Sequence, residues 1–179
     1  MKLSETPIAG AWLLEVEPIA DDRGFFARSL CVDTLAAHGL EGRMQQQSVS
    51  FNLQRGTLRG MHYQNAPHAE TKLVRVTRGR VYDVMLDMRQ ESPSFLCWHA
   101  VELSADNHRT LYIPEGVAHG FQTLENYSEV FYQMAQPYMP GYACGVRWDD
   151  PAFGIDWPLT DPVLSERDAS YPDLALDES

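Results

Sequence analysis

The chain has 179 residues, a hydrophobic fraction of 44% and a charged fraction of 22%, which are ordinary values for a globular protein of one domain. No apolar run is long enough to cross a bilayer, and the N-terminal residues lack the apolar core of a signal peptide, so we expect a cytoplasmic protein with no membrane partner. The formal net charge of -11 argues against nucleic acid as a partner.

The charge is distributed unevenly along the chain. Residues 1–90 carry 11 Lys and Arg against 10 Asp and Glu, whereas residues 91–179 carry 3 against 15. The basic side chains lie in the half that also contains most of the polar motifs. An acidic protein of this kind can therefore still hold a small anionic ligand.

Three cysteines, Cys31, Cys97 and Cys144, are widely spaced and form no CxxC pair. In a reducing compartment we interpret them as small buried hydrophobic residues, not as a disulfide framework or a zinc site. A catalytic thiol is the less favoured alternative.

Helical signals are few. The best candidate runs from Val32 to His38, with Asp33 near its start and Gly39 as a C-terminal stop. A second short helix is expected only within the Pro- and Asp-rich C-terminal segment.

Short strand signals are numerous in the middle of the chain. Over 80–89 and 130–135, side chains that point to one side alternate with side chains that point to the other, which is the period of a strand. Further strands are expected over 73–77, 99–103 and 110–113, which are bounded by turn residues.

Many short strands with Gly and Pro between them predict an all-β fold, a jelly-roll sandwich or barrel. We expect a single domain over 1–179, with its jelly-roll core at about 45–140. The remaining residues, about 145–179, are expected to wrap the outside as loops and a short helix.

The first polar motif is the run from Arg59 to Gln64, which contains His62. An arginine and a histidine three residues apart, with Gly60 between them, would bring a cation and a titratable base to one strand end. On the spacing alone, a surface arginine and a histidine in a core hydrogen bond are an equally good interpretation.

The second polar motif is the run from Pro114 to Phe121, whose PxGxxH pattern ends at His119 and is the second half-motif of the cupin jelly roll. Metal-binding cupins need HxH followed by Glu in the first half-motif, but here His62 is followed by Tyr63 and Gln64. Two histidines fall short of the three or four ligands of such sites, so we expect no bound metal.

Side chains must then perform the chemistry. His62 is the natural base because the ordinary pKa of histidine lies near working pH, and Asp168 is a candidate for the carboxylate that orients it. Lys72 is a candidate for a fixed positive charge in the same cavity. Tyr132 and Tyr138 are further candidates, although a tyrosine on a strand is more often packed in a core.

Taken together, these motifs resemble the dTDP-4-dehydrorhamnose 3,5-epimerase family, and the match runs nearly from end to end. The segments that carry the resemblance are Asp22–Phe26, Leu58–Gln64, Lys72–Val74, Ile113–Phe121, Trp148–Pro151, Ile155–Pro158 and Ser165–Asp168.

The resemblance implies a homodimeric jelly roll, with no metal and no diffusible cofactor, that acts on a nucleotide-linked 4-keto-6-deoxyhexose. It implies inversion at C3 and C5, or at C3 alone. His62 would accept the proton, oriented by Asp168, and Tyr132 would donate a proton from the opposite face. Lys72 would stabilise the enolate oxygen, which is what a preorganised cation does for a developing oxyanion.

The resemblance also implies a set of substrate-binding residues, with Arg59 near the diphosphate and Tyr138 stacked on the nucleotide base. Arginine suits a diphosphate because it binds oxyanions in a bidentate manner. The full set is Arg23, Arg28, Gln46, Gln47, Ser48, Arg59, His119, Tyr138 and Arg167.

Three departures from the family pattern bear on the ligand. Arg28 stands where the family often has glutamate, Ala143 replaces a second common glutamate, and Gln46–Ser48 stands where Gln-x-Asn is usual, with a one-residue insertion before Gly56. We expect epimerase chemistry to survive these changes while the nucleotide or the sugar differs.

Two other functions remain open. A 3,4-ketoisomerase of the same sugars also uses a cupin fold, but it needs proton delivery within one face, which the His-Tyr-Gln and lysine pattern fits less well. An inactive sugar-nucleotide-binding cupin is disfavoured because His62, Lys72, Tyr132 and Asp168 are all present.

Overall fold

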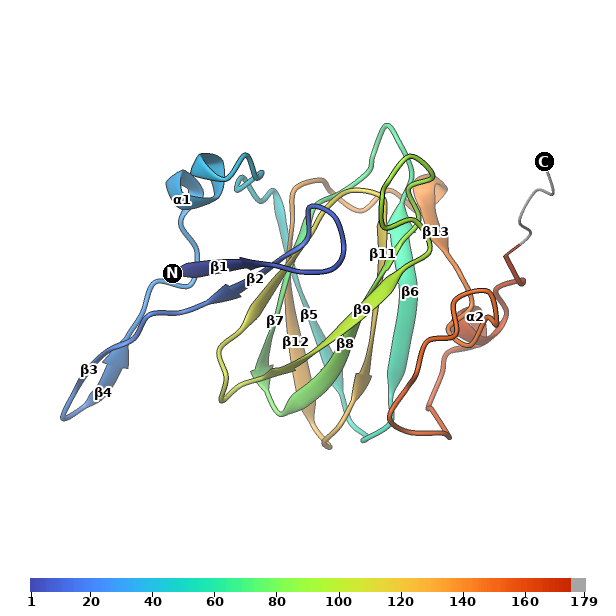
Figure 1. The fold of residues 1–179 in the computed structure, drawn as a ribbon. Coiled ribbons are helices and arrows are strands. Elements are labelled where there is room, and N and C mark those ends of the chain that lie inside the picture. Colours follow the sequence, from blue (N-terminus) through green and yellow to red (C-terminus); the bar gives the residue numbers. More distant parts are fainter. Residues whose placement is uncertain (175–179) are drawn as a thin grey trace.

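The computed structural model describes residues 1–174 and consists of two antiparallel β-sheets packed face to face (Figure 1). The six-stranded sheet has the order β1 (Lys2–Glu5), β2 (Trp12–Glu15), β10 (Thr110–Ile113), β7 (Lys72–Arg78), β12 (Ser128–Met134) and β5 (Gln46–Asn52). The five-stranded sheet has the order β13 (Ala143–Gly145), β6 (Leu58–Gln64), β11 (Val117–Thr123), β8 (Arg80–Asp87) and β9 (Trp98–Ser104).

The remaining elements are short. Strands β3 (Ile19–Asp21) and β4 (Gly24–Phe26) form a separate hairpin, and the helices are α1 (Val32–Ala37), the 3-10 turn η1 (Pro140–Tyr142) and α2 (Glu166–Ala169). The predicted all-β class is confirmed, and so are the helix at 32–38 and the five predicted strands.

The main core lies between the two sheets. Strand alternation on β8 sends Val81 and Met85 into this core, together with Val130 of β12 and Phe121 of β11. Both faces of β8 are apolar because the opposite face is covered as well. At about 25 cal/mol per Å² of apolar surface, this two-sided burial is the main stabilising contribution of the central strands.

The C-terminal segment covers the outer face of the five-stranded sheet. Phe153, Ile155 and Trp157 pack against Val84 and Leu86 of β8. The indole N–H of Trp157 donates to the carbonyl of Trp148 at 2.8 Å. This segment continues into α2, which lies beside β6 at the right of Figure 1.

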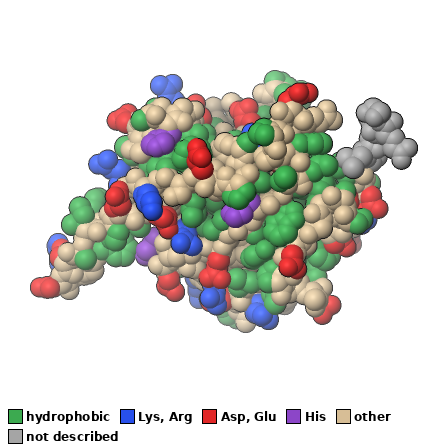
Figure 2. All heavy atoms as spheres, in the orientation of Figure 1, with side chains coloured by type: hydrophobic (Ala, Val, Ile, Leu, Met, Phe, Trp, Pro, Cys, Tyr) green, Lys and Arg blue, Asp and Glu red, His purple; other side chains and the backbone are tan. Residues whose placement is uncertain are grey.

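The N-terminal residues contribute more to the sheets than expected. Strands β1 and β2 extend the six-stranded sheet, so the sheet takes strands from outside the expected 45–140 core. The β3–β4 hairpin projects away from the body of the molecule (Figures 1 and 2). Hydrophobic side chains are exposed on this hairpin, and Phe26 is 77% exposed.

The expectation of buried cysteines was wrong. All three are free thiols, but Cys97 is exposed and Cys31 and Cys144 are only half-buried. Cys97 lies in a surface turn that precedes β9, where no core residue is needed.

No helix in the described part of the chain is long and apolar enough to span a membrane.

Candidate active site

A cavity of about 440 Å³ lies between the two sheets and is lined largely by polar side chains. Ten of the thirteen residues predicted to form the site line it. The full lining is Gln46, Ser48, Ser50, Arg59, His62, Glu70, Lys72, His119, Tyr132, Met134, Tyr138, Ser165, Arg167 and Asp168.

Strand β6 delivers both Arg59 and His62 to this cavity, although a spacing of three would put them on opposite faces of a regular strand. The pairing with β11 is irregular here: His62 faces His119, but Arg59 faces Phe121, so β6 holds one extra residue. Gly60 makes this possible, because its φ is +146° and an added Cβ would lie 2.5 Å from the Cα of Gly120.

His62 is paired with Asp168, its predicted partner. The two residues are 106 positions apart, and His62 Nε2 lies 2.6 Å from Asp168 Oδ1. Burial alone would raise the pKa of Asp168, but the hydrogen bond and charge of His62, together with hydrogen bonds from the backbone of Gly60 and from Ser165, outweigh burial and lower that pKa. The carboxylate is therefore ionised, and Nδ1 is the imidazole nitrogen that is left to exchange a proton.

Lys72 is buried at the start of β7 and its ammonium group is held by two oxygen atoms. Its Nζ lies 3.0 Å from Glu70 Oε1 and 3.2 Å from the carbonyl oxygen of His62. Glu70 also accepts a hydrogen bond from Gln64 Nε2 at 3.2 Å. Sequence reasoning missed Glu70, although an extended chain puts residues two apart on the same side.

His119 forms a second pair, with Asp83 of β8. Its Nε2 lies 2.9 Å and 3.0 Å from the two carboxylate oxygens, and both side chains are almost completely buried. Burial raises the pKa of Asp83, and His119 opposes this rise. Asp83 was also missed, although a carboxylate on the core-facing side of a strand is a signal for a partnered or functional group.

Tyr132 of β12 lines the same cavity, and its ring centroid is 5.7 Å from that of His119. Its hydroxyl forms no hydrogen bond with another side chain or backbone group among residues 1–174. Burial raises the pKa of Tyr132 well above its ordinary value; the charge of Asp83 adds to this effect, and Arg59 opposes it. The phenol is therefore protonated at neutral pH.

Arg59 is oriented by a buried amide. Its Nε donates to Asn52 Oδ1 at 2.8 Å, and Asn52 Nδ2 donates to the carbonyl of Ser128 at 3.2 Å. Near the mouth of the cavity, the backbone N–H of Tyr138 donates to Gln46 Oε1 at 3.0 Å. Asn52 is another residue that sequence reasoning missed, since a single Asn next to a turn carries no distinctive signal.

Three predicted residues do not line the cavity. Arg23 is exposed on the β3–β4 hairpin and pairs with Asp21. Arg28 is exposed after β4, with Nη1 3.7 Å from the sulfur of Cys31. Gln47 is exposed because strand alternation on β5 turns it away from Gln46 and Ser48.

Within the described range, no group of three or more His, Cys, Asp and Glu side chains is arranged to hold a metal ion. His62 and His119 face each other on neighbouring strands, but the Nε2 atom of each is occupied by a carboxylate. The expectation of a metal-free site stays a prediction.

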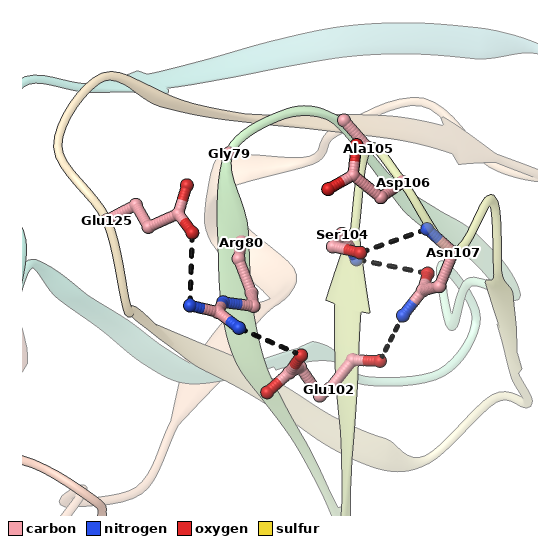
Figure 3. A pocket seen from close by; sticks show the side chains of 8 residues that line it. All are labelled: Gly79, Arg80, Glu102, Ser104, Ala105, Asp106, Asn107 and Glu125. Atoms are coloured by element: carbon pink, nitrogen blue, oxygen red, sulfur yellow. Dashed lines mark hydrogen bonds and ion pairs between the residues drawn. The ribbon is translucent and has the colours of Figure 1, made fainter.

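A second cavity, of about 450 Å³, lies at the β7–β8 turn (Figure 3). Its polar groups satisfy one another: Arg80 contacts both Glu102 and Glu125, and Asn107 contacts Ser104 and the backbone of Glu102. The cavity at His62 differs because a histidine, a lysine and a tyrosine converge there.

Comparisons with known proteins agree with this geometry. A family model described as dTDP-4-dehydrorhamnose 3,5-epimerase matches residues 5–176. A dTDP-4-dehydrorhamnose 3,5-epimerase of Salmonella typhimurium is 41% identical over 175 residues, which cover 96% of this chain and 94% of the relative.

Solved structures are similar over the same length. The dTDP-4-dehydrorhamnose 3,5-epimerase of Bacillus anthracis, with TDP and PPi bound, has a TM-score of 0.93 and 43% identity, covering 97% of this chain and 99% of that one. A Legionella pneumophila epimerase in complex with dTDP-4-keto-L-rhamnose has a TM-score of 0.88 and 37% identity, covering 95% and 90%. The chain therefore belongs to the dTDP-4-dehydrorhamnose 3,5-epimerase family.

Proposed function

We propose that this protein inverts C3 and C5 of a nucleotide-linked 4-keto-6-deoxyhexose, with dTDP-4-keto-6-deoxyglucose as substrate, in deoxysugar biosynthesis. One observation carries the proposal: His62 and Tyr132 come from different sheets and line one cavity. Inversion of a carbon needs a base on one face of the ring and an acid on the other.

In the first step, His62 Nδ1 takes the proton from the carbon next to the C4 ketone. The electron pair of the broken C–H bond forms the enolate double bond, and the negative charge passes to the C4 oxygen. Lys72 stabilises that charge, and Asp168 stabilises the imidazolium that His62 becomes. Proximity of these groups in one cavity also lowers the entropic part of the barrier.

In the second step, Tyr132 donates its phenolic proton to the same carbon from the opposite face. The C4 ketone re-forms, and Tyr132 is left as a phenolate. Exchange with solvent then returns a proton to the phenolate and removes one from the imidazolium. The same cycle at the second carbon completes the double inversion.

The same arrangement disfavours the other functions. A 3,4-ketoisomerase moves the carbonyl and returns the proton within one face, so it does not need an acid on the opposite wall. An inert binder does not need a buried ammonium beside a histidine–carboxylate pair. Keeping these charges in a partly dry cavity costs stability, and such an arrangement is typical of a catalytic site.

Deuterium labelling tests the reaction directly. The protein is incubated with dTDP-4-keto-6-deoxyglucose in deuterated water, and the product is analysed by proton NMR. We expect deuterium and inverted configuration at C3 and C5. Label at C3 alone would indicate a C3 epimerase, a moved keto carbon would indicate an isomerase, and no label with this or any other nucleotide sugar would contradict enzymatic function.

The nucleotide can be tested separately from the reaction. Two of the three departures from the family pattern, Arg28 and Ala143, do not line the cavity, whereas Gln46 and Ser48 of the third departure do. None of the three replaces His62, Lys72, Tyr132 or Asp168. The departures from the family pattern alone favour a different nucleotide or sugar, but the relatives are named for dTDP-linked sugars, so we expect dTDP to raise the melting temperature more than GDP, CDP or UDP at equal concentration. A larger shift with another nucleotide would reassign the substrate without removing the epimerase chemistry.

The proposal includes a homodimer. The exposed side chains of Ile19 and Phe26 on the projecting hairpin, and those of Val49 and Phe51 on the outer face of β5, form apolar surface that a second copy can cover. In such a dimer the hairpin of one subunit reaches the partner subunit. This would account for the position of Arg23, which is remote from the cavity of its own chain.

A further inference from the structure

Gly145 leaves a space that the ring of Tyr171 fills. A Cβ added to Gly145 would lie 2.3 Å from Cζ and 2.7 Å from Cε2 of Tyr171. No real side chain tolerates such distances, so the ring occupies the position of the missing side chain. Gly145 is also the residue of β13 that pairs with His62 of β6.

The Tyr171 ring therefore lies next to the proposed base. Its centroid is 6.2 Å from that of His62, with an angle of 60° between the planes. The Tyr171 hydroxyl accepts a hydrogen bond from Arg167 Nε at 2.8 Å. The ring of Tyr171 thus lies beside His62, and its hydroxyl holds Arg167, which lines the cavity.

Helix α2, which carries Arg167, depends on contacts with the rest of the fold for its stability. Helix α2 has only four residues, far fewer than an isolated helix needs for stability, yet it carries both Arg167 and Asp168. Ser165 caps its start by accepting from the N–H of Asp168 at 3.1 Å. On the C-terminal side, Tyr171 is the first side chain that fixes the helix to the sheet.

Resting on the proposed function, we propose that Tyr171 is a positioning residue with two separable roles. Its ring, seated on Gly145, holds α2 so that Asp168 meets His62, and its hydroxyl aims Arg167 at the substrate. The ring thus acts on proton transfer and the hydroxyl acts on substrate binding. The sequence gives no sign of this, because Gly145 and Tyr171 lie in segments without periodicity.

Two substitutions of Tyr171 separate the roles. Tyr171→Phe keeps the ring and removes the hydrogen bond to Arg167, so we expect KM to rise about tenfold while kcat changes less than about twofold. Tyr171→Ala removes both contacts, so we expect kcat to fall by about 100-fold as well, because small displacements of catalytic groups are costly. A residue with only a general structural role would change stability and not split kcat from KM in this way.

A double-mutant cycle tests the contact with Gly145. Gly145→Ala should push the ring away and lower kcat about as strongly as Tyr171→Ala does. In the Tyr171→Ala background the same Gly145→Ala change should have almost no further effect, because the ring it would strike is gone. Gly141→Ala is the matched control, since a Cβ there meets nothing within 4 Å.

The readouts are kcat, KM and deuterium exchange, with thermal unfolding of every variant. Additive effects in the cycle, or a Tyr171→Phe variant that loses kcat as much as Tyr171→Ala, would overturn the proposal. A Gly145→Ala variant that fails to fold while the double variant folds would support it. Absence of exchange in the unsubstituted protein would refute the proposed function instead, so the two failures are distinguishable.

Discussion

The two histidines of the cavity have different surroundings, and this difference supports the proposed roles. The side chain of His62 is 37% exposed, whereas that of His119 is 4% exposed. A base must exchange its proton with solvent in every cycle, and the more exposed His62 is better placed for this exchange than the buried His119. His119 is therefore better suited to hold the substrate than to act as the base.

His62→Ala tests the base. We expect deuterium exchange at both carbons to fall by at least about 100-fold, which is the usual contribution of a general base. The fold should persist, since the loss of one hydrogen bond to buried Asp168 costs about 1–3 kcal/mol. Exchange near the rate of the unsubstituted protein would remove His62 as the base, and His38→Ala, at the residue that follows α1, is the control.

Tyr132→Phe tests the acid. Removing only the hydroxyl should reduce completed inversion more than it reduces proton abstraction, because His62, Lys72 and Asp168 remain in place. The measurement compares the loss of deuterium from substrate labelled at C3 and C5 with the appearance of inverted product. Equal losses of both would indicate a structural role for Tyr132.

At the scale of elements, strand β5 was not predicted, although it forms one wall of the site. Strand β5 carries Gln46, Ser48 and Ser50 on its inward face and Val49 and Phe51 on its outward face. This reverses the usual pattern of apolar residues inside, so hydrophobic periodicity gives no signal for it. The core strands β8 and β12, by contrast, were predicted from periodicity because they face the apolar core.

Long-range pairs were beyond sequence reasoning for a different reason. Spacing along the chain gives no reason to bring Asp168 to His62, and only the resemblance to the family implied that contact. The contact between Asp83 and His119 is equally non-local, since it depends on the pairing of β8 with β11. The residues of a site can be named from motifs, but their partners follow from the sheet order.

The turn after β8 is a second element with a testable electrostatic role. Burial alone would raise the pKa of Asp87, but hydrogen bonds from Arg89, Ser92 and Ser94 outweigh it and lower the pKa to about 2. Arg89 Nη2 also donates to the carbonyl of Ala9 at 2.6 Å, so this network joins the turn to the N-terminal loop.

The sign of the pH effect follows from the lowered pKa of Asp87. The stabilisation is complete above the unfolded-state pKa of about 4 and is lost as the pH falls toward 2. We expect Asp87→Asn to lower the free energy of unfolding by about 2 kcal/mol at pH 7, and this difference should shrink between pH 4 and pH 2. Urea unfolding at several pH values measures it, with the exposed Asp149→Asn as the control.

At the scale of the whole molecule, the net charge of -11 contrasts with a cavity that is lined by several basic side chains. Arg59, Lys72 and Arg167 all line it, against the carboxylates Glu70 and Asp168. The sequence already indicated this contrast through the basic excess of its first half. We expect the acidic exterior to disfavour nucleic acid, while the basic side chains of the cavity favour the sugar diphosphate of the proposed function.

The apolar side chains of the projecting hairpin are exposed to water in a lone subunit. If a second copy covers it, Phe26→Asp should place a charge in a buried apolar contact and shift the protein to monomers, which light scattering measures. Activity should fall with the dimer, since Arg23 would no longer reach the partner's cavity. Val163→Asp, an equally simple change at an exposed residue of the C-terminal segment, should leave the oligomeric state and the activity unchanged. A Phe26→Asp variant that stays dimeric and fully active would show that the hairpin has no part in the assembly, and an unsubstituted protein that is monomeric would refute the dimer itself.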